Sequence, residues 1–177
     1  MSWIYFLKFK FETFENFKKF KALLEKQSGK SVKALHTDRG GEFLSKNFDE
    51  FCEENGIGRE LTAPYTPEHN GVVERNNRTV VEMASTLLKA KGLPDLFWGE
   101  AVATAVYLLN ISPTKVVLNQ SPYEAWMGKK PRVSRLKVFG CIAYALVNFC
   151  SKLDEKSEKC IFIGYSTKFR HIVYIIL

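Results

Sequence analysis

The sequence predicts a mixed α/β region followed by a small β unit. Before Pro131, apolar runs of β type alternate with segments whose apolar side chains recur at helical spacing. After Pro131 only runs of β type follow, so we place a boundary near residues 130–134. The 177 residues are enough for one domain, or for one domain and a fragment. A content of 46% hydrophobic and 25% charged residues excludes a wholly disordered chain.

The first predicted elements are a strand over residues 2–10 and a helix that begins near Thr13. Aromatic and aliphatic side chains fill most of the first segment, which is typical of a largely buried strand. Thr13 can cap the helix, and Phe14 and Phe17 begin its apolar stripe. Gly29 ends the helix, because glycine adopts the left-handed conformation found at helix C-termini.

Two short strands and two further helices are predicted next. A β-type run over residues 32–37 stops at a sharp turn, and a short helix over 48–55 leads to a second strand over 57–63. A long helix over 71–91 follows. Its predicted apolar stripe consists of Val73, Val80, Ala84 and Leu87.

Proline and glycine positions divide the rest of the chain. Gly92 and Pro94 end the long helix, and Pro122 suits the first turn of a short one. We predict helices over 95–110 and 121–126, and β-type runs over 136–147, 159–165 and 172–177.

The chain carries a formal net charge of +7 with a sequence pI near 9.2, which fits a phosphate-bearing partner. Many basic proteins bind no particular anion, so the charge alone leaves both interpretations open. The four cysteines form no C-x2-C pair and the three histidines are scattered, so we expect free thiols and no zinc site. No apolar run reaches the roughly 18–20 residues of a membrane span, and no signal peptide pattern is present. We therefore expect a nuclear or cytoplasmic protein that is not secreted.

Two carboxylates stand where separate elements can bring them to one point. Asp38 closes a predicted strand, Glu74 lies early on the long helix, and 35 residues separate them. Hard Mg²⁺ or Mn²⁺ ions take oxygen ligands of this kind. Most Asp and Glu side chains are solvated surface acids, however, and the spacing alone favours that interpretation.

Several sequence blocks resemble the integrase catalytic core of copia-type retrotransposons, a branch of the retroviral integrase superfamily. L-H-T-D-R-G-G-E-F contains Asp38, and P-Y-T-P-E-H-N-G-V-V-E-R-N-N-R contains Glu74. K-C-I-F-I-G-Y-S is similar to the SH3-like β unit that follows such cores in their Pol polyproteins. The blocks occur in order at residues 35–43, 64–78, 92–110, 121–126, 136–144 and 159–166.

The resemblance implies a ribonuclease H-like core over residues 1–130 and a partial SH3-like β unit over 131–177. It also implies that Asp38 and Glu74 are the last two carboxylates of a D, D-35-E triad, catalytic through Mg²⁺ or Mn²⁺. The implied reaction is DNA integration by polynucleotidyl transfer. The implied partners are double-stranded DNA, with weak sequence preference, and further copies of the chain, with no small-molecule substrate and no membrane.

The first aspartate of that triad has no counterpart in this sequence. In the family it lies on the first strand, whereas this chain starts at what resembles the third strand. The acids before Asp38 are Glu12, Glu15 and Glu25, and none matches the missing position. We therefore expect no strand transfer by this chain alone. The alternative to an integrase core is a non-catalytic DNA-binding or interaction remnant of a decayed retroelement.

Basic side chains accompany Glu74 on the long helix. At about 100° per residue, Arg78 and Lys89 project within roughly 40–60° of Glu74, and Arg75 flanks them. We predict that these three cations contact DNA phosphates, which carries no sequence preference. The alternative is a solubilising helix face with a Glu74–Arg78 pair. His36, two residues before Asp38, is more simply a packed or solvated side chain than a metal ligand.

Overall fold

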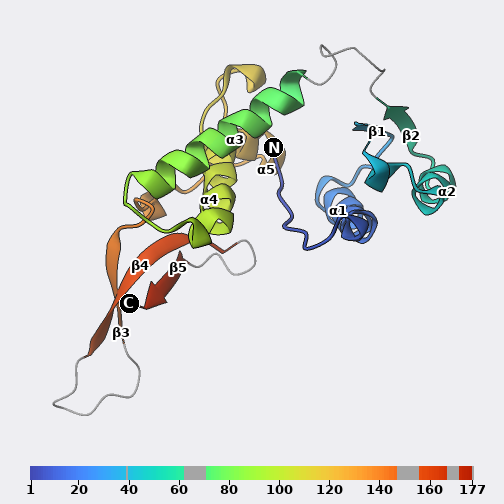
Figure 1. Ribbon diagram of the computed structural model, residues 1–177. Coiled ribbons are helices and arrows are strands. Elements are labelled where there is room, and N and C mark those ends of the chain that lie inside the picture. The colour runs from blue at the N-terminus through green and yellow to red at the C-terminus, as the bar shows by residue number, and fades with distance from the viewer. Residues whose placement is uncertain (39, 62–70, 147–155, 167–171, 177) are drawn as a thin grey trace. The chain divides into compact units, whose positions relative to one another are not determined.

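The computed structural model describes residues 1–38, 40–61, 71–146, 156–166 and 172–176. It divides the chain into two compact units (Figure 1). One unit is Tyr5–Asn76, and the other combines Met1–Ile4 with Asn77–Leu177. We call them the phenylalanine-rich unit and the tryptophan unit, because all three tryptophans of the chain lie in the second.

The phenylalanine-rich unit packs two helices against a pair of parallel strands. In order, its elements are the 3-10 turn η1 (Lys10–Glu12), α1 (Thr13–Ser28), β1 (Ala34–Thr37), the 3-10 turn η2 (Gly41–Phe43), α2 (Lys46–Glu54) and β2 (Gly58–Leu61). The strands β1 and β2 pair in parallel, with His36 opposite Glu60. Helix α1 ends where the sequence predicts, at Gly29, whose φ of 66° is left-handed.

The core of this unit is aromatic. Phe48, Cys52 and Ile57 are buried, and the partly buried side chains around them include Phe14 and Phe17. The two α1 rings are three positions apart, so both face α2 and lie 5.3 and 5.0 Å from the ring of Phe48. The predicted stripe of α1 is therefore the surface that positions this helix.

The predicted strand over residues 2–10 is wrong. The structure assigns no strand there, and most of its large apolar side chains, Phe6 and Phe9 among them, are exposed. A strand is stabilised by hydrogen bonds to a neighbouring strand, and none of the described strands pairs with this segment. The segment is rich in apolar residues, as a strand would be. Its sequence pattern, however, cannot show whether a neighbouring strand is there to pair with it.

The tryptophan unit consists of helices that pack on an antiparallel sheet. Helix α3 (Gly71–Lys89) has its first residues in the other unit and the rest here. It is followed by η4 (Asp95–Phe97), α4 (Trp98–Ile111), η5 (Lys115–Val117), α5 (Pro122–Met127), η6 (Val133–Arg135), β3 (Ile142–Leu146), β4 (Ser157–Tyr165) and β5 (Ile172–Ile176). Strand β4 is central and pairs with both β3 and β5.

Helices α3 and α4 form the core of the tryptophan unit, together with β4. Val80 and Ala84 are buried as the sequence predicts, but the next core residue is Leu88, and Leu87 is only partly buried. Val73, the first predicted member of the stripe, is exposed. The stripe of α3 therefore covers only its C-terminal half, where α4 provides the opposing surface.

The N-terminal residues are held in the tryptophan unit by the end of α4. The side-chain oxygen of Asn110 accepts the Ser2 backbone N–H at 2.8 Å, and its amide donates to the Ser2 carbonyl at 2.7 Å. The ring of Trp3 meets that of Trp126 edge to face at 5.2 Å. These contacts are polar and aromatic, and they replace the pairing that a strand would have made.

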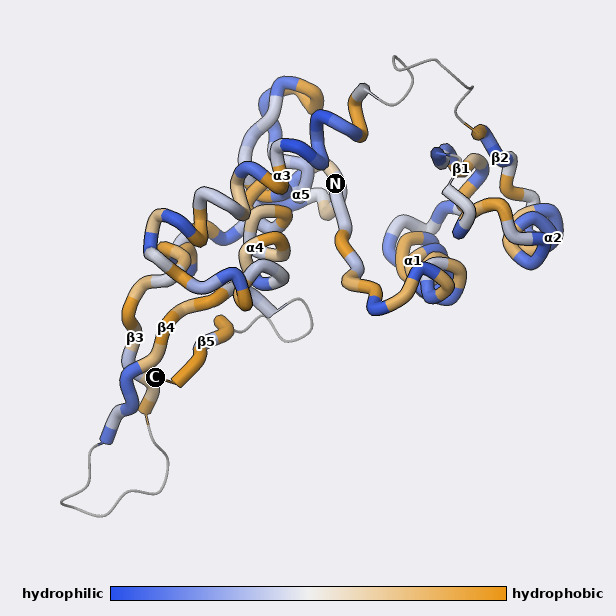
Figure 2. The backbone as a smooth tube through the Cα atoms, in the orientation of Figure 1, coloured by the Kyte–Doolittle hydropathy of each residue, from blue (hydrophilic) through white to orange (hydrophobic). Residues whose placement is uncertain are grey.

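Apolar side chains remain on the surface of the C-terminal sheet. Figure 2 shows β5 as hydrophobic, yet four of its five residues, 173–176, are exposed. Of the cysteines, Cys52, Cys141 and Cys160 are free as predicted, and Cys150 lies outside the described residues. Within the described ranges, no helix is both long and apolar enough to span a membrane.

Candidate nucleic-acid and metal site

Asp38 lies directly after β1, at the start of an exposed turn. Its Oδ1 accepts the backbone N–H of Gly40 at 3.0 Å, which is the hydrogen bond of an Asx turn. Residue 39 lies outside the described residues. The hydrogen bond between Asp38 and Gly40 agrees with the turn predicted after the strand. Asp38 itself is exposed to solvent.

The far end of this turn is fixed by a residue that the sequence analysis missed. Arg59, on β2, donates from Nη2 to the carbonyl of Phe43 at 2.5 Å, and its Nη1 is ion-paired with Asp49. The guanidinium also lies over the ring of Phe48, 5.2 Å from its centroid. Because η2 ends at Phe43, Arg59 ties the segment that follows Asp38 to β2 and α2.

The pattern of the strand contained a signal for Arg59. Ile57, just before β2, is buried, and Arg59 follows two residues later on the same face of the strand, whereas Leu61 is exposed. The side chain of Arg59 is only 13% exposed, so it occupies an inward position. A charged residue at an inward position of an otherwise apolar alternation indicates a specific buried partner.

His36 is solvated, in agreement with the simpler interpretation. Its ring is mostly exposed and contacts the carboxylate of Glu60, the residue directly opposite on β2. This contact is an ion pair when the imidazole is protonated. His36 and Glu60 are therefore an exposed cross-strand pair, a kind of contact that contributes little to stability.

Glu74 lies in the first turn of α3 and is exposed. A carboxylate is favourable there, because the helix dipole presents partial positive charge at the N-terminus. The adjacent Arg75 is turned toward the same end, and its Nε donates to the carbonyl of Gly71 at 2.9 Å. Residues 62–70, which precede the helix and contain part of the block at residues 64–78, lie outside the described residues.

The described residues do not assemble a complete metal-binding cluster. No group of three His, Cys, Asp or Glu side chains among them could hold a metal ion. Asp38 and Glu74 provide the oxygen ligands that Mg²⁺ and Mn²⁺ prefer, but two carboxylates are fewer than a two-metal site needs. The donor type therefore fits these ions and the number of ligands does not.

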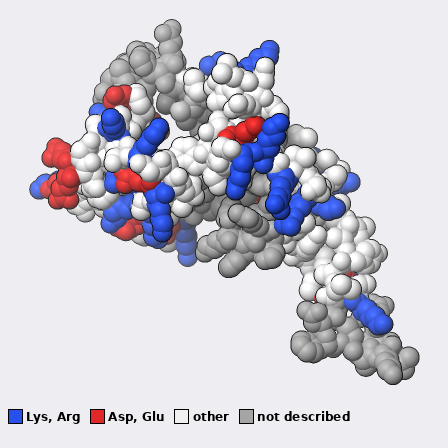
Figure 3. Space-filling view, turned by 180° about the vertical axis from the view of Figure 1, so that it is seen from behind, with Lys and Arg blue, Asp and Glu red and all other residues white. Residues whose placement is uncertain are grey.

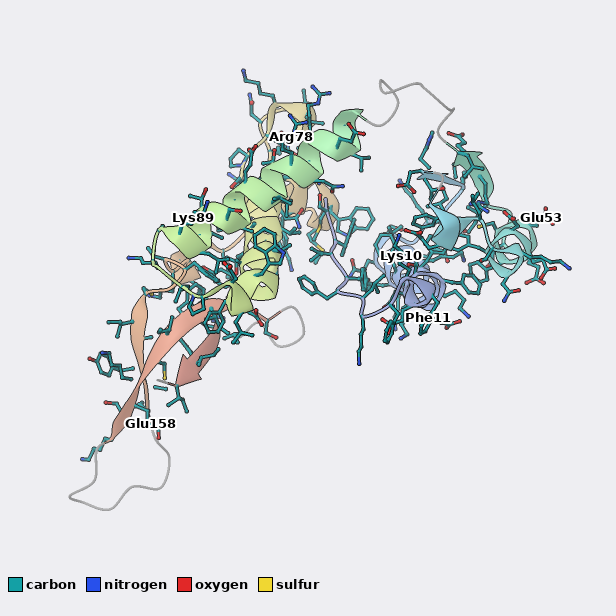
Figure 4. All side chains as sticks on the ribbon, viewed as in Figure 1. Lys10, Phe11, Glu53, Arg78, Lys89 and Glu158 are labelled. Carbon is teal, nitrogen blue, oxygen red and sulfur yellow. The ribbon has the colours of Figure 1, made fainter. Side chains whose placement is uncertain are left out.

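The basic strip of α3 is exposed at the predicted positions. Arg78 and Lys89 are both exposed, and Figure 4 labels them toward opposite ends of the helix. Glu74 and Arg78 make no ion pair in the described part of the chain. The Glu74–Arg78 pair of the alternative interpretation is therefore not observed. Glu82, which the sequence analysis left out, lies on the same strip at about 80° from Glu74 and reduces its net charge.

Together these observations define a class of protein. The order of helices and strands, a parallel strand pair with a carboxylate at its end, and a C-terminal antiparallel sheet describe a mixed α/β core followed by a β unit. The family model for the TnsB C-terminal domain matches residues 24–90, and that for the retroviral polymerase SH3-like domain matches residues 141–176.

A solved structure of similar fold supports this description. A chain of the simian T-cell lymphotropic virus intasome, in complex with PP2A regulatory subunit B56 gamma, matches with a TM-score of 0.52 at 16% identity. The match covers 96% of this chain and 63% of that one. The magnesium-bound catalytic core of HTLV-2 integrase, in its trimeric form, matches with a TM-score of 0.49 at 25% identity, over 66% of this chain and 69% of that one. The predicted fold class, an integrase-type core followed by an SH3-like unit, is confirmed.

Sequence relatives are more specific than the fold. The Pol polyprotein of transposon TNT 1-94 from Nicotiana tabacum is 49% identical over 165 residues, which is 92% of this chain and 12% of that protein. The Pol polyprotein of transposon RE1 from Arabidopsis thaliana is 40% identical over 167 residues, 93% of this chain and 11% of that protein. The homologues of this chain are thus copia-type, retrovirus-related Pol polyproteins of plant transposons, and the chain spans about one eighth of their length or less.

Proposed function

We propose that this chain is a DNA-binding part of a retrotransposon integrase, in which Asp38 and Glu74 are carboxylates of the catalytic metal site. The observation that carries the proposal is the placement of these two acids. Asp38 directly follows β1, Glu74 lies in the first turn of α3, and 35 residues separate them within a region that is 49% identical to the retrovirus-related Pol polyprotein of a plant transposon.

Mg²⁺ or Mn²⁺, when bound in such a site, activates the attacking oxygen and stabilises the leaving oxygen of a phosphodiester. Asp38 and Glu74 would hold the ions, while the exposed cations of α3 would orient the DNA backbone. Arg59 would keep the Asp38 turn in place through the Phe43 carbonyl.

We further propose that the chain as given is not catalytically competent, because a third carboxylate is missing. The three acids that precede Asp38 each have another role. Glu12 accepts the Lys8 backbone N–H, Glu15 pairs with Lys18, and Glu25 binds both Lys21 and the backbone of Val32. The same observation, that none of these three acids is available as a third metal ligand, favours the alternative of a non-catalytic DNA-binding or interaction remnant.

The remaining parts of the proposal concern partners and organisation. We expect double-stranded DNA with little sequence preference as the partner, self-association, and a nuclear or cytoplasmic location. We also expect a boundary between an integrase core, residues 1–130, and a β unit, residues 131–177.

The catalytic part is tested with a labelled duplex and Mg²⁺ or Mn²⁺. We expect neither 3′-processing nor strand transfer by the chain as given. Clear joining that is abolished by Glu74→Gln would refute the claim of incompetence and establish the site. Joining that survives Glu74→Gln and Asp38→Asn would refute the site itself.

The binding part is tested by the salt dependence of duplex binding. Each neutralised phosphate adds about 0.9 to the magnitude of the slope of log K against log salt. The triple variant Arg75→Gln, Arg78→Gln, Lys89→Gln should therefore flatten that slope by about 1.8–2.7. An unchanged slope would exclude α3 as a phosphate-binding surface.

A rescue experiment separates the fold from the metal site. Two family-like strands that carry the missing aspartate, added before Met1, should make the melting temperature rise with Mn²⁺ concentration by mass action. That rise should vanish with Asp38→Asn. A well-folded extended chain without any Mn²⁺ effect at millimolar concentration would show that Asp38 and Glu74 are not metal ligands.

A further inference from the structure

The net positive charge of the chain is confined to one part of it. Residues 1–76 contain 12 Lys and Arg and 12 Asp and Glu, whereas residues 77–177 contain 14 and 7. The entire net charge of +7 therefore lies after Asn76. On the face shown in Figure 3, blue and red side chains intermingle around α1 and α2, and blue predominates over the tryptophan unit.

The densest part of this excess is residues 129–137, which we call the basic segment. It contains five cations within nine residues and no acid, and all five are exposed. Four of them make no ion pair within the described part of the chain. The five cations are Lys129, Lys130, Arg132, Arg135 and Lys137, and Arg135 is the one with a further contact.

The basic segment is fixed to the sheet and is not a free linker. The Tyr165 hydroxyl, from the end of β4, accepts the Lys137 backbone N–H at 2.8 Å and contacts the Lys137 carbonyl at 3.3 Å. The ring of Tyr165 stacks on that of Tyr107 of α4, with centroids 4.2 Å apart. Just before, the 3-10 turn η6 closes with the Leu136 N–H donating to the Val133 carbonyl. A segment held in this way loses less conformational entropy when it binds a ligand.

A cation from another element lies beside the basic segment. At Gly140, three residues after Lys137, an added Cβ would lie 2.7 Å from the Cβ of Lys91 and 2.8 Å from its Cγ. The stem of Lys91 therefore packs on this glycine, and its exposed ammonium group extends the positive surface. The surface thus combines the loop after α3 with the approach to β3.

We propose that the basic segment, together with Lys91, binds the phosphodiester backbone of duplex nucleic acid as a second surface beside the α3 strip. This inference rests on the proposed DNA-binding function and names a surface for it. Exposed cations without acids neutralise phosphates and do not distinguish bases. A lipid surface fits less well, because the only helical part is the three-residue turn η6, which cannot present an amphipathic face.

The test compares two variants of the full chain that lose the same charge. In the first, the five cations of the basic segment are replaced by Gln. In the matched control, five exposed lysines of the phenylalanine-rich unit are replaced instead: Lys8, Lys19, Lys26, Lys30 and Lys33. Both variants lose five positive charges, so a difference between them reports location and not net charge. Thermal unfolding followed by circular dichroism establishes that each variant is folded, because the control's substitutions lie in the unit that contains no tryptophan.

Binding is measured by fluorescence anisotropy with a labelled duplex DNA of random sequence over a range of salt concentrations. We expect the basic-segment variant to lose about 2.7 from the magnitude of the salt slope, which corresponds to at least three phosphates, while the control keeps the wild-type slope. Tyr165→Phe retains every charge, so it should weaken binding about fivefold, the equivalent of one hydrogen bond, at an unchanged slope.

The outcomes distinguish this inference from the proposed function. Equal slopes for the basic-segment variant and its control, in a wild type that binds DNA, would overturn the inference and leave DNA binding to α3. A wild type that binds no duplex would overturn both. Titrations with duplex RNA and with phosphatidylserine vesicles use the same two variants. Selective loss of vesicle binding alone would overturn the assignment to nucleic acid.

Discussion

The substitution Arg59→Met tests whether the Asp38 turn depends on a buried guanidinium. Methionine retains an unbranched apolar side chain of similar length but removes the charge and the donors. The loss includes a charge-assisted hydrogen bond to the Phe43 carbonyl, about 1.5–3 kcal/mol, and a cation–π contact with Phe48, about 0.5–1 kcal/mol. The ion pair with Asp49, which is 52% exposed, contributes less than about 1 kcal/mol.

One feature of the wild type reduces this sum. The Nε of Arg59 is buried without a hydrogen-bond partner among the residues that the structure describes, and an unsatisfied donor costs about 1–3 kcal/mol. Methionine removes that cost, so we expect a net loss of about 2 kcal/mol in the free energy of opening. This corresponds to roughly a 30-fold larger open fraction. Asp49→Asn, which keeps the guanidinium and its carbonyl bond, should cost less than about 1 kcal/mol.

Cysteine alkylation in the intact chain measures this opening. The thiol of Cys52 is 1% exposed in the aromatic core, and burial raises its pKa, so labelling requires the unit to open. Cys160 is equally buried but lies in the tryptophan unit, and it serves as an internal control. We expect Arg59→Met to accelerate labelling of Cys52 about 30-fold and to leave Cys160 unchanged. An unchanged rate at Cys52, or an equal rise at both cysteines, would refute the role of Arg59.

Three further predictions concern the tryptophan unit. Its unfolding can be measured by tryptophan fluorescence. Tyr165→Phe removes the hydroxyl that binds the backbone of Lys137, so it should lower the free energy of unfolding by about 1 kcal/mol in denaturant titrations. Asn110→Leu leaves both backbone groups of Ser2 without their partner and should cost about 1–3 kcal/mol by the same measurement; no change would show that the N-terminal residues are not held there. Burial raises the pKa of Tyr107 and of Tyr165. The stability that these phenols contribute is therefore present below about pH 10 and is lost as the pH rises through their folded-state pKa values. A free energy of unfolding that stays constant up to complete ionisation of the phenols would contradict this.

Local patterns predicted helices well, because each boundary depends on a nearby residue. Gly29 ends α1 with a positive φ, and Ser121 caps α5 through a hydrogen bond from the N–H of Glu124 at 3.0 Å. The strand over residues 2–10 could not be judged in this way, because strand pairing depends on a distant segment. The phase of the α3 stripe, which includes Leu88 and excludes Val73, is likewise set by where α4 packs.

The candidate site was predictable to the same degree. Asp38 and Glu74 were identified by the resemblance, because their spacing alone favoured solvated acids, and the structure describes Asp38 directly after β1 and Glu74 in the first turn of α3. Arg59 was missed because its role comes from three contacts that converge on one guanidinium from η2, α2 and the aromatic core. Glu82 was missed because the sequence analysis considered only the cations of this helix face and not the acid among them.

The location of the charges explains why the two parts of the proposal, DNA binding and metal binding, can be tested separately. The two carboxylates lie in a unit with no net charge, whereas the whole positive excess lies after Asn76. Phosphate contact depends on the number of exposed cations, and each contributes nearly independently to the salt slope. Metal binding depends instead on a complete set of ligands, so it is sensitive to the number of carboxylates present. We therefore expect duplex binding that does not depend on the metal site, and we expect the basic segment to contribute most to it.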